Sequence, residues 1–200
     1  MDLIKLQESI GGTDIYLLDQ ILKRRYSIED RILDAGCGKG RNLKWFYKNN
    51  YAIYGVDQNK ENIDYVKQKF NKKSPYFSVQ NLEELNYEDA SFNHIICNAV
   101  LHFAKDTTHF LAMFSELVRV VKSNGTIFIR TATIEGIKDK TELISEGVYK
   151  LPDKTTRYLL TKALLNQIQQ QFDVELIEPF KYVNVDDLRC MATLVFKKVK

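Results

Sequence analysis

Apolar residues follow two alternating spacings along most of the chain, one typical of buried strands and the other typical of helices. Short apolar runs that predict strands lie at residues 32–33, 52–56, 76–79, 94–97 and 126–129. Between most of these runs, although not between the third and the fourth, apolar residues recur every three or four positions, as they do on the buried face of a helix. Strands and helices that alternate in this way predict a parallel sheet covered by helices on both faces.

The beginning of the chain carries two helical patterns ahead of the first strand. The first pattern stops at Gly11 and Gly12, because glycine favours helix ends. The second helix can begin with Thr13 or Asp14 as its N-cap residue. Its predicted apolar face consists of Ile15, Leu18 and Leu22. We therefore expect residues 1–29 to form a helical cap on the sheet.

The pattern changes after the fifth strand. Residues 133–159 are polar and have no long apolar period, which predicts a surface excursion. A last helix is expected around residues 160–168, and two further strands near 174–177 and 192–197 bring the predicted total to seven. Because a chain of 200 residues can bury one sizeable core, we expect a single domain over residues 1–200.

Composition narrows the class of protein. The chain is 44% hydrophobic and 28% charged, as in ordinary globular proteins. Its net charge of +3 comes from scattered lysines instead of a basic stripe, so a nucleic-acid partner is not indicated. No apolar run is long enough for a membrane span or a secretion signal, which predicts a cytoplasmic location. Cys37, Cys97 and Cys190 are far apart and are expected to be free thiols.

Candidate chemistry lies where the first strand meets a glycine-rich turn. Gly36, Gly38 and Gly40 permit a tight turn and a close approach of a ligand to the backbone. Asp57 follows about 20 residues later, at the end of the second strand, where a carboxylate can accept hydrogen bonds from a ribose. This combination predicts a nucleoside site; the alternative is that the glycines only pack a strand against a helix. Arg41 stands at the third-glycine position of a dinucleotide fingerprint, which disfavours a nicotinamide cofactor.

These residues resemble the class I S-adenosylmethionine-dependent methyltransferases. The motifs that carry the resemblance are Asp34 to Gly40, Gly55 to Asp57, Asn81 with Leu82, Phe92 to Asn98, and Leu117 to Gly125. The resemblance covers about residues 13–132. It implies an α/β fold with a Rossmann-like, seven-stranded, mostly parallel sheet whose last strand is antiparallel, and S-adenosylmethionine as the cofactor. Within the family, the string Gly-Cys-Gly-x-Gly-Arg-Asn is most similar to the tellurite-resistance and thiopurine-type enzymes, which act on small or inorganic acceptors.

The resemblance also implies roles for individual residues. Asp57 would hold the ribose, Asn81 and Leu82 the adenine, and the backbone of residues 35–38 the methionine part of the cofactor. Asn98 would lie near the sulfonium, or else only cap the next turn. The residues expected to bind the cofactor are Asp34, Ala35, Gly36, Cys37, Gly38, Arg41, Asp57, Gln58, Asn81, Leu82 and Asn98.

For Arg41 and for His102, two roles each are consistent with the sequence. Arg41 either pairs with the cofactor carboxylate or is a solvated residue in the first turn of a helix. His102 is the one histidine placed to remove a proton from an acceptor, although a packing role is the alternative and methyl transfer to a good nucleophile needs no base. We interpret His94 and His109 as structural, and expect no metal site.

The identity of the methyl acceptor is the least determined part of the function. The chain has Asn-Ala-Val-Leu at residues 98–101, where relatives that methylate exocyclic or amide nitrogens often carry Asn/Asp-Pro-Pro-Tyr/Phe. We therefore expect a small-molecule acceptor and in-line methyl transfer. The alternatives are a nucleic-acid or protein methyltransferase, a non-catalytic S-adenosylmethionine-binding protein and an NAD(P)-dependent oxidoreductase. Residues 133–159, with Tyr149, Arg157 and Tyr158, either cover the acceptor pocket or form an ordinary surface loop.

Overall fold

Eight strands form the main sheet of the protein, in a computed structural model that describes residues 2–199. Their bounds are β1 (Arg31–Ala35), β2 (Ala52–Asp57), β3 (Phe77–Val79), β4 (Phe92–Asn98), β5 (Val121–Ala132), β9 (Val174–Leu176), β10 (Lys181–Val185) and β11 (Arg189–Lys198). The order is β10–β11–β5–β4–β1–β2–β3, with β9 also paired to β11. Strands β1 to β5 are mutually parallel and β11 is antiparallel to β5, which confirms the predicted fold class.

The sheet has one strand more than the pattern predicts. Strands β9 and β10 both pair with β11 and are separated by residues 177–180, which include Pro179. Proline has no backbone N–H to donate to a neighbouring strand, so the ladder is interrupted there. The residues of β10 are mostly exposed and show no alternation of apolar and polar positions, which is why only the first of the two strands was expected.

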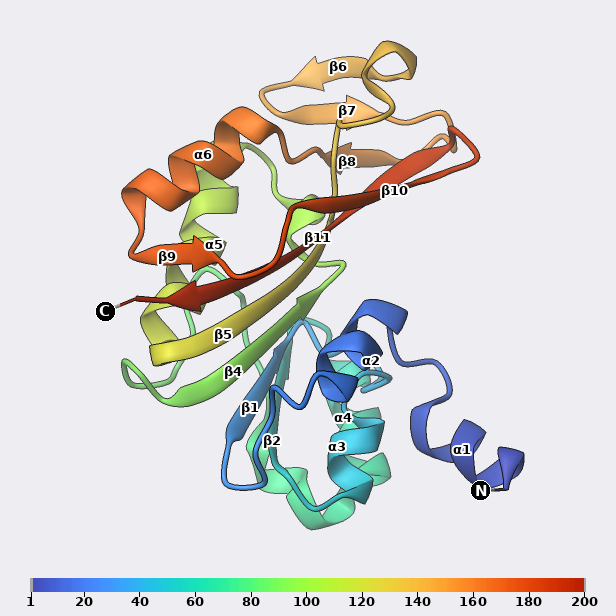
Figure 1. Ribbon diagram of the computed structural model, residues 1–200, viewed down its shortest axis with the longest axis vertical. Coiled ribbons are helices and arrows are strands. Elements are labelled where there is room, and N and C mark those ends of the chain that lie inside the picture. The colour runs from blue at the N-terminus through green and yellow to red at the C-terminus, as the bar shows by residue number, and fades with distance from the viewer. Residues whose placement is uncertain (1, 200) are drawn as a thin grey trace.

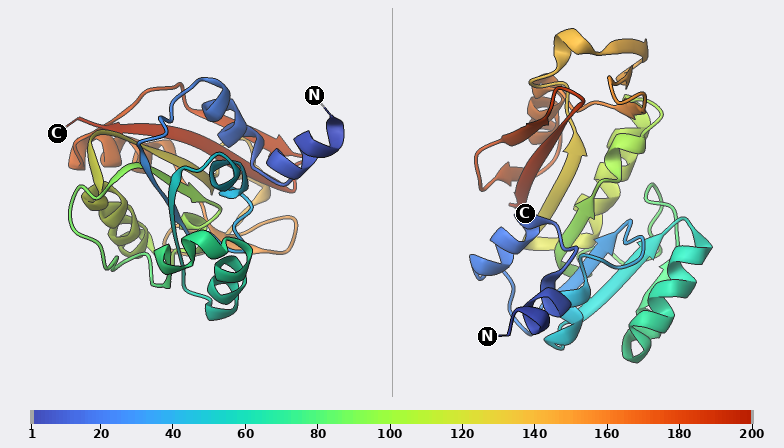
Figure 2. Two further views of the ribbon diagram at one scale, coloured as in Figure 1. Left: turned by 90° about the horizontal axis from the view of Figure 1, so that it is seen from below. Right: turned by 90° about the vertical axis from the view of Figure 1, so that its right-hand side faces the viewer.

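Helices cover both faces of the main sheet, as predicted. Their bounds are α2 (Ile15–Leu22), α3 (Lys44–Lys48), α4 (Lys60–Lys69), α5 (Thr107–Val120) and α6 (Lys162–Gln171). Helices α5 and α6 pack on one face, and α2, α3 and α4 pack on the other (Figures 1 and 2). Within β1, Leu33 joins the cluster that contains Phe114 of α5, whereas Ile32 joins the cluster that contains Phe46 of α3. Successive side chains of one strand therefore supply both layers of the core.

The N-terminal cap packs differently from the prediction. Helix α1 (Leu3–Ile10) has no buried residue, and α2 begins at its N-cap Asp14. Helix α2 buries Leu17 and Gln20, whereas Ile15 and Leu22 are 71% and 81% exposed. The predicted apolar face of Ile15, Leu18 and Leu22 is therefore wrong. The helix is turned so that the polar side chain of Gln20 is buried, where its amide donates a hydrogen bond to Glu178.

Residues 133–159 form a second, three-stranded antiparallel sheet, which lies at the top of Figure 1. Its strands are β6 (Glu142–Ser145), β7 (Val148–Lys150) and β8 (Thr156–Tyr158). All residues of β6 are exposed, so the sequence there has no apolar period that would indicate a strand. Tyr158 is buried, stacks on Phe110 of α5 at 5.1 Å and hydrogen-bonds Thr107 through its hydroxyl at 3.0 Å. These contacts anchor the small sheet to the body of the protein.

Short 3₁₀ helices complete the backbone at η1 (Asn71–Tyr76), η2 (Leu101–Phe103) and η3 (Lys138–Lys140). Of these, η2 directly follows β4 and contributes to the site described below. Within residues 2–199, each helix is too short or too polar to span a lipid bilayer.

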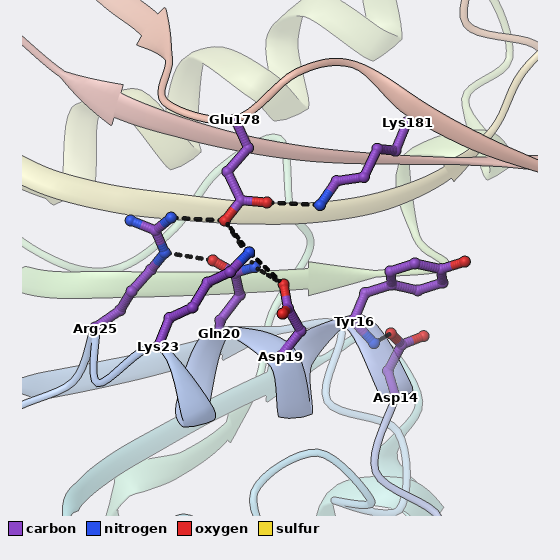
Figure 3. Close-up of polar contacts among 8 residues, drawn as sticks. All are labelled: Asp14, Tyr16, Asp19, Gln20, Lys23, Arg25, Glu178 and Lys181. Atoms are coloured by element: carbon purple, nitrogen blue, oxygen red, sulfur yellow. Dashed lines mark hydrogen bonds and ion pairs between the residues drawn. The ribbon is translucent and has the colours of Figure 1, made fainter.

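Glu178 joins the N-terminal cap to the main sheet (Figure 3). It lies between β9 and β10, and its side chain is 8% exposed. Its carboxylate accepts hydrogen bonds from Lys23 (2.8 Å), Arg25 (2.6 Å), Gln20 (3.1 Å) and Lys181 (2.6 Å). Burial acts to raise the pKa of Glu178, but these hydrogen bonds outweigh it and hold the pKa well below its usual range. The buried Gln20 is thus explained by this cluster.

Replacing Glu178 by Gln should lower the free energy of unfolding by about 1–3 kcal/mol near neutral pH, because three cations lose their carboxylate. A lowered pKa stabilises the folded state above the unfolded value of about 4.3, and that contribution is lost as the pH falls. The difference between wild type and variant in urea unfolding should therefore shrink below about pH 4.

The matched control is Asp64→Asn, which removes the exposed Lys60–Asp64 ion pair of α4. We expect no measurable change for this control. Equal effects of the two substitutions would show that Glu178 contributes no more than a surface ion pair.

Candidate active site

The glycine-rich turn between β1 and α3 is tied to the end of β2. The backbone N–H groups of Gly36 and Cys37 both donate to the carbonyl of Val56 at 2.8 Å. The N–H of Gly38 donates to Asp57 Oδ2, also at 2.8 Å. These N–H groups are thus engaged within the protein, and they fix both the path of the turn and the orientation of the Asp57 carboxylate.

Gly36 and Gly38 of the turn differ in the space that a side chain would have. Gly36 has φ 84°, and a Cβ atom there would lie 2.2 Å from the Val100 side chain. Gly38 has φ 51°, but a Cβ atom there would meet no other atom within 4 Å. Close packing therefore requires glycine at position 36, whereas at position 38 the backbone borders open space.

A cavity of about 470 Å³, called the first cavity below, opens beside the turn. The predicted cofactor residues that line it are Gly36, Gly38, Asp57, Gln58 and Leu82. Ala35 and Cys37 are buried and do not line this cavity. Asn81 does not line it either, although its neighbours Gln80 and Leu82 do. The structure thus brings the ends of β1, β2 and β3 together around one space, as expected for the carboxyl edge of a parallel sheet.

Helix α5 and the segment before it provide a wall of the first cavity that the sequence pattern did not indicate. Lys105, His109 and Met113 line this wall, and His109 Nε2 lies 3.5 Å from a carboxylate oxygen of Glu83. His109 was interpreted as structural, yet it borders the cavity. Its position one helical turn before Met113, soon after the fourth strand, is the signal that could have identified it.

The carboxyl group of Asp34 is buried at the end of β1 without a partner. The residue is 1% exposed, and neither carboxyl oxygen has a hydrogen-bond partner in the described chain. Burial raises the pKa of Asp34 to about 7; the charge of Asp57 adds to the increase, and Arg41 opposes it. The carboxyl group is therefore only partly ionised at neutral pH, and it lies behind the residues that line the first cavity.

The end of β4 separates the first cavity from a second one. Asn98 is 8% exposed, and its Oδ1 accepts from Arg41 Nη2 at 3.1 Å, while its Nδ2 has no partner within residues 2–199. Ala99, with φ 62°, lines both cavities. A non-glycine residue in the left-handed region is uncommon and often marks a functional segment. Besides its hydrogen bond to Asn98, the guanidinium of Arg41 donates to the carbonyl of Gly12 at 3.5 Å.

The second cavity has a volume of about 340 Å³ and combines segments that are far apart in the chain. Asp14 comes from the N-terminal cap, and Arg41 and Asn98 come from the glycine turn and β4. The C-terminal part of β5 and the start of β11 add Arg130 and Arg189. The predicted excursion supplies a further wall through Leu151, Asp153, Thr155 and Arg157.

His102 lies in η2 and lines the second cavity. Burial lowers the pKa of His102 to about 4, and the positive charge of Arg157 adds to this effect. The ring is therefore neutral at physiological pH, and its Nδ1 accepts a hydrogen bond from the backbone N–H of Ala132 at 3.3 Å. Acceptance at Nδ1 places the single ring proton on Nε2.

His94 lies away from both cavities. Its two ring nitrogens contact Thr126 Oγ1 at 2.7 Å and Asp30 Oδ2 at 3.0 Å, as expected for a structural residue. No cluster of three or more His, Cys, Asp or Glu side chains within residues 2–199 is arranged to hold a metal ion.

Comparisons with known proteins agree with this geometry. Residues 33–129 match the family described as methyltransferase domain. An uncharacterised methyltransferase of Bacillus subtilis, YodH, is 28% identical over 104 residues, which cover 50% of this chain and 42% of YodH. The match therefore spans less than half the length of that relative.

Solved structures share the fold. A SAM-dependent methyltransferase from Methanosarcina mazei has a TM-score of 0.71 at 19% identity, covering 90% of this chain and 97% of its own. The 1,6-didemethyltoxoflavin-N1-methyltransferase of Burkholderia thailandensis, solved with 1,6-didemethyltoxoflavin and S-adenosylhomocysteine, has a TM-score of 0.70 at 14% identity and covers 98% of this chain and 81% of its own.

The matched domain begins at β1 and ends within β5, and therefore contains the glycine turn, Asp57 and Asn98. The rest of the sheet follows the same fold in the solved structures. Residues 33–129 thus match a methyltransferase domain, and the fold that the chain shares with solved S-adenosylmethionine-dependent methyltransferases supports S-adenosylmethionine as the cofactor.

Proposed function

We propose that this protein transfers the methyl group of S-adenosylmethionine to a small-molecule acceptor bound in the second cavity. The observation that supports this proposal most directly is that the two cavities meet at Ala99, immediately after Asn98 at the carboxyl end of β4. Ligands of open α/β sheets bind at this edge. A donor in the first cavity and an acceptor in the second would meet at that boundary, where alignment and exclusion of water accelerate the reaction.

The residues around the first cavity fit the chemical groups of the cofactor. Asp57 Oδ2 can accept a ribose hydroxyl beside its existing hydrogen bond, since each carboxylate oxygen has two acceptor positions. The unpartnered carboxyl of Asp34 suits the ammonium group of the methionine part. Leu82 offers an apolar surface for the adenine, Asn81 can accept from the adenine amino group, and Gln58 can bond the ribose.

When bound, the cofactor supplies an electrophilic methyl carbon on a positively charged sulfur, so that the acceptor's lone pair forms the new bond while the carbon–sulfur electron pair returns to sulfur. In our proposal Asn98 donates through its free Nδ2 to the acceptor, and Arg41 fixes the Asn98 side chain through Oδ1. His102 donates from Nε2 and positions the acceptor, because a neutral histidine with a pKa of about 4 is a weak base. Any acceptor proton then passes to water.

Residues 133–159 cover the acceptor in this proposal. The loop between β7 and β8 forms one wall of the second cavity, whose volume of about 340 Å³ lies at the small end of ligand pockets. A space of this small volume favours a small molecule over a nucleic acid or a protein. The Burkholderia relative, whose name gives 1,6-didemethyltoxoflavin as its substrate, also acts on a small molecule. The narrower similarity to tellurite-resistance and thiopurine-type enzymes stays a prediction.

The experiment that tests the function is calorimetric titration with S-adenosylmethionine, with NAD and NADP as controls. Saturable binding of the methyl donor alone is expected. An acceptor screen with thiols, small amines, carboxylic acids and metalloid oxyanions then follows, with methylated products detected by mass spectrometry. Binding of the donor without any turnover would favour the non-catalytic alternative, and binding of NAD or NADP would contradict the proposal.

Replacing Asp57 by Ala should weaken S-adenosylmethionine binding by about 1–3 kcal/mol, because a ribose hydrogen bond to a charged carboxylate is lost. Asp57 also accepts from Gly38, and its Oδ1 accepts from the N–H of Asn59 at 2.9 Å, so the turn itself can shift. Asp57→Asn, which keeps one acceptor oxygen, is therefore the companion variant and should show a smaller loss. Calorimetry measures both, and unchanged affinity in both variants would remove Asp57 from the site.

Asp34 should make cofactor binding depend on pH. With a pKa of about 7 in the free protein, the carboxyl is increasingly protonated below that pH and loses its attraction for an ammonium group. The affinity for S-adenosylmethionine should fall about tenfold between about pH 7.5 and pH 6. In Asp34→Asn the affinity should be lower and nearly independent of pH over this range.

Asp34→Asn should lower the affinity for the cofactor but stabilise the free protein at neutral pH. A raised carboxyl pKa means that the folded state retains a proton that the unfolded chain releases, so stability falls as the pH rises from 3.8 toward about 7. Asparagine removes this dependence. The melting temperature of Asp34→Asn relative to wild type, measured without ligand, should increase between about pH 5 and pH 7.5. A constant difference would argue against a buried, titrating Asp34.

A further inference from the structure

The second cavity holds a concentration of positive charge that methyl transfer does not require. Four guanidinium groups line it, and they face only two carboxylates. The arginines are Arg41, Arg130, Arg157 and Arg189, and the aspartates are Asp14 and Asp153. Arg41 is occupied with Asn98, which leaves three guanidinium groups for a ligand.

Arg130 is the most enclosed of the three. Its side chain is 12% exposed, its guanidinium lies 4.4 Å from the ring centre of Tyr16, and Nη1 donates to Thr193 Oγ1 at 2.9 Å. Its buried Nε has no hydrogen-bond partner within the described chain, and Asp14 Oδ2 lies 3.7 Å away, beyond hydrogen-bond length. A buried donor without a partner costs free energy unless a ligand satisfies it.

Arg157 and Arg189 are also incompletely paired. Arg157 lies over the ring of Phe103 at 4.8 Å and donates to the carbonyl of Thr156, and it forms no ion pair with residues 2–199. Arg189 lies 3.7 Å from Asp153, again too far for a hydrogen bond. Stacking on an aromatic ring holds a guanidinium plane in place while its N–H groups stay available.

We propose that the acceptor carries an anionic oxygen group, a carboxylate or a phosphate, which Arg130, Arg157 and Arg189 hold in the second cavity. The proposal rests on the proposed function and names the chemical class of its substrate. Guanidinium groups bind such oxyanions through paired N–H donors, and these charge-assisted bonds are stronger beside a largely buried side chain such as Arg130 than at the surface.

The oxyanion serves for recognition and is not the atom that receives the methyl group. Hydrogen bonds from guanidinium groups draw electron density from an oxyanion and make it a poorer nucleophile. The methylated atom is therefore a separate nucleophile of the same molecule, directed toward Asn98 and Ala99 at the boundary with the first cavity. In this arrangement the arginines fix the orientation of the acceptor.

The test compares anionic and neutral probes on the protein saturated with S-adenosylhomocysteine. Benzoate, inorganic phosphate and neutral benzamide are titrated at an ionic strength held constant with sodium chloride, and the melting temperature is recorded. The variants are Arg157→Gln and Arg189→Gln, because Arg130 also bonds Thr193 and its loss can disturb the fold. Lys72→Gln, which removes one exposed positive charge from η1, is the matched control.

We expect benzoate or phosphate, but not benzamide, to raise the melting temperature. Arg157→Gln should weaken this binding about tenfold, and Arg189→Gln less, since its side chain is more exposed; Lys72→Gln should bind as wild type does. A stronger response to benzoate identifies a carboxylate, and a stronger response to phosphate identifies a phosphoryl group.

An oxyanion effect no larger than that of benzamide, or one equal in all variants, would overturn the anionic acceptor while leaving the proposed function intact. Stabilisation by S-adenosylhomocysteine is measured in the same experiment before any probe is added. Its absence would instead overturn the proposed function, so the two failures are distinguishable.

Discussion

The site depends on the hydrogen bonds that tie the glycine-rich turn to the end of β2. The N–H of Gly38 orients the carboxylate of Asp57, and this contact places the turn on the carboxyl edge of the sheet. Because Gly36 has no side chain, Val100 packs directly against the turn. That packing brings the segment after β4, with Ala99 in a left-handed conformation, to the boundary between the two cavities.

The two cavities differ in how they are built. The first is formed by the ends of adjacent parallel strands and by α5, which belong to the core of the fold. The second collects side chains from α2, β5, β11 and the small β6–β8 sheet. Its shape depends on the contacts that hold these segments to the body of the protein, above all the Glu178 cluster beside α2 and the stacking of Tyr158 on Phe110 of α5. Changes in these additions can alter the second cavity without disturbing the first.

Charge is also sorted between the cavities. The carboxylates of Asp57 and Glu83 border the first together with Lys105, and the buried Asp34 is nearby, whereas guanidinium groups outnumber carboxylates in the second. A cationic sulfonium donor and an anionic acceptor would each be stabilised on its own side of Asn98 and Ala99.

The sequence by itself determined the central fold and the position of the first cavity, because both depend on local patterns. Buried parallel strands give continuous apolar runs, and the helices between them give a period of three to four residues. The glycine turn and Asp57 lie at fixed points of that alternation, so their proximity follows from the topology.

Only the tertiary structure decided the orientation of α2, the strands β6, β7, β8 and β10, and the second cavity. Gln20 is buried in place of an apolar residue because Glu178, far away in the chain, satisfies its amide. The exposed strands leave no period in the sequence, since neither of their faces packs fully on a core. The arginines of the second cavity are scattered from position 41 to position 189, so their convergence depends on long-range packing that no local pattern encodes.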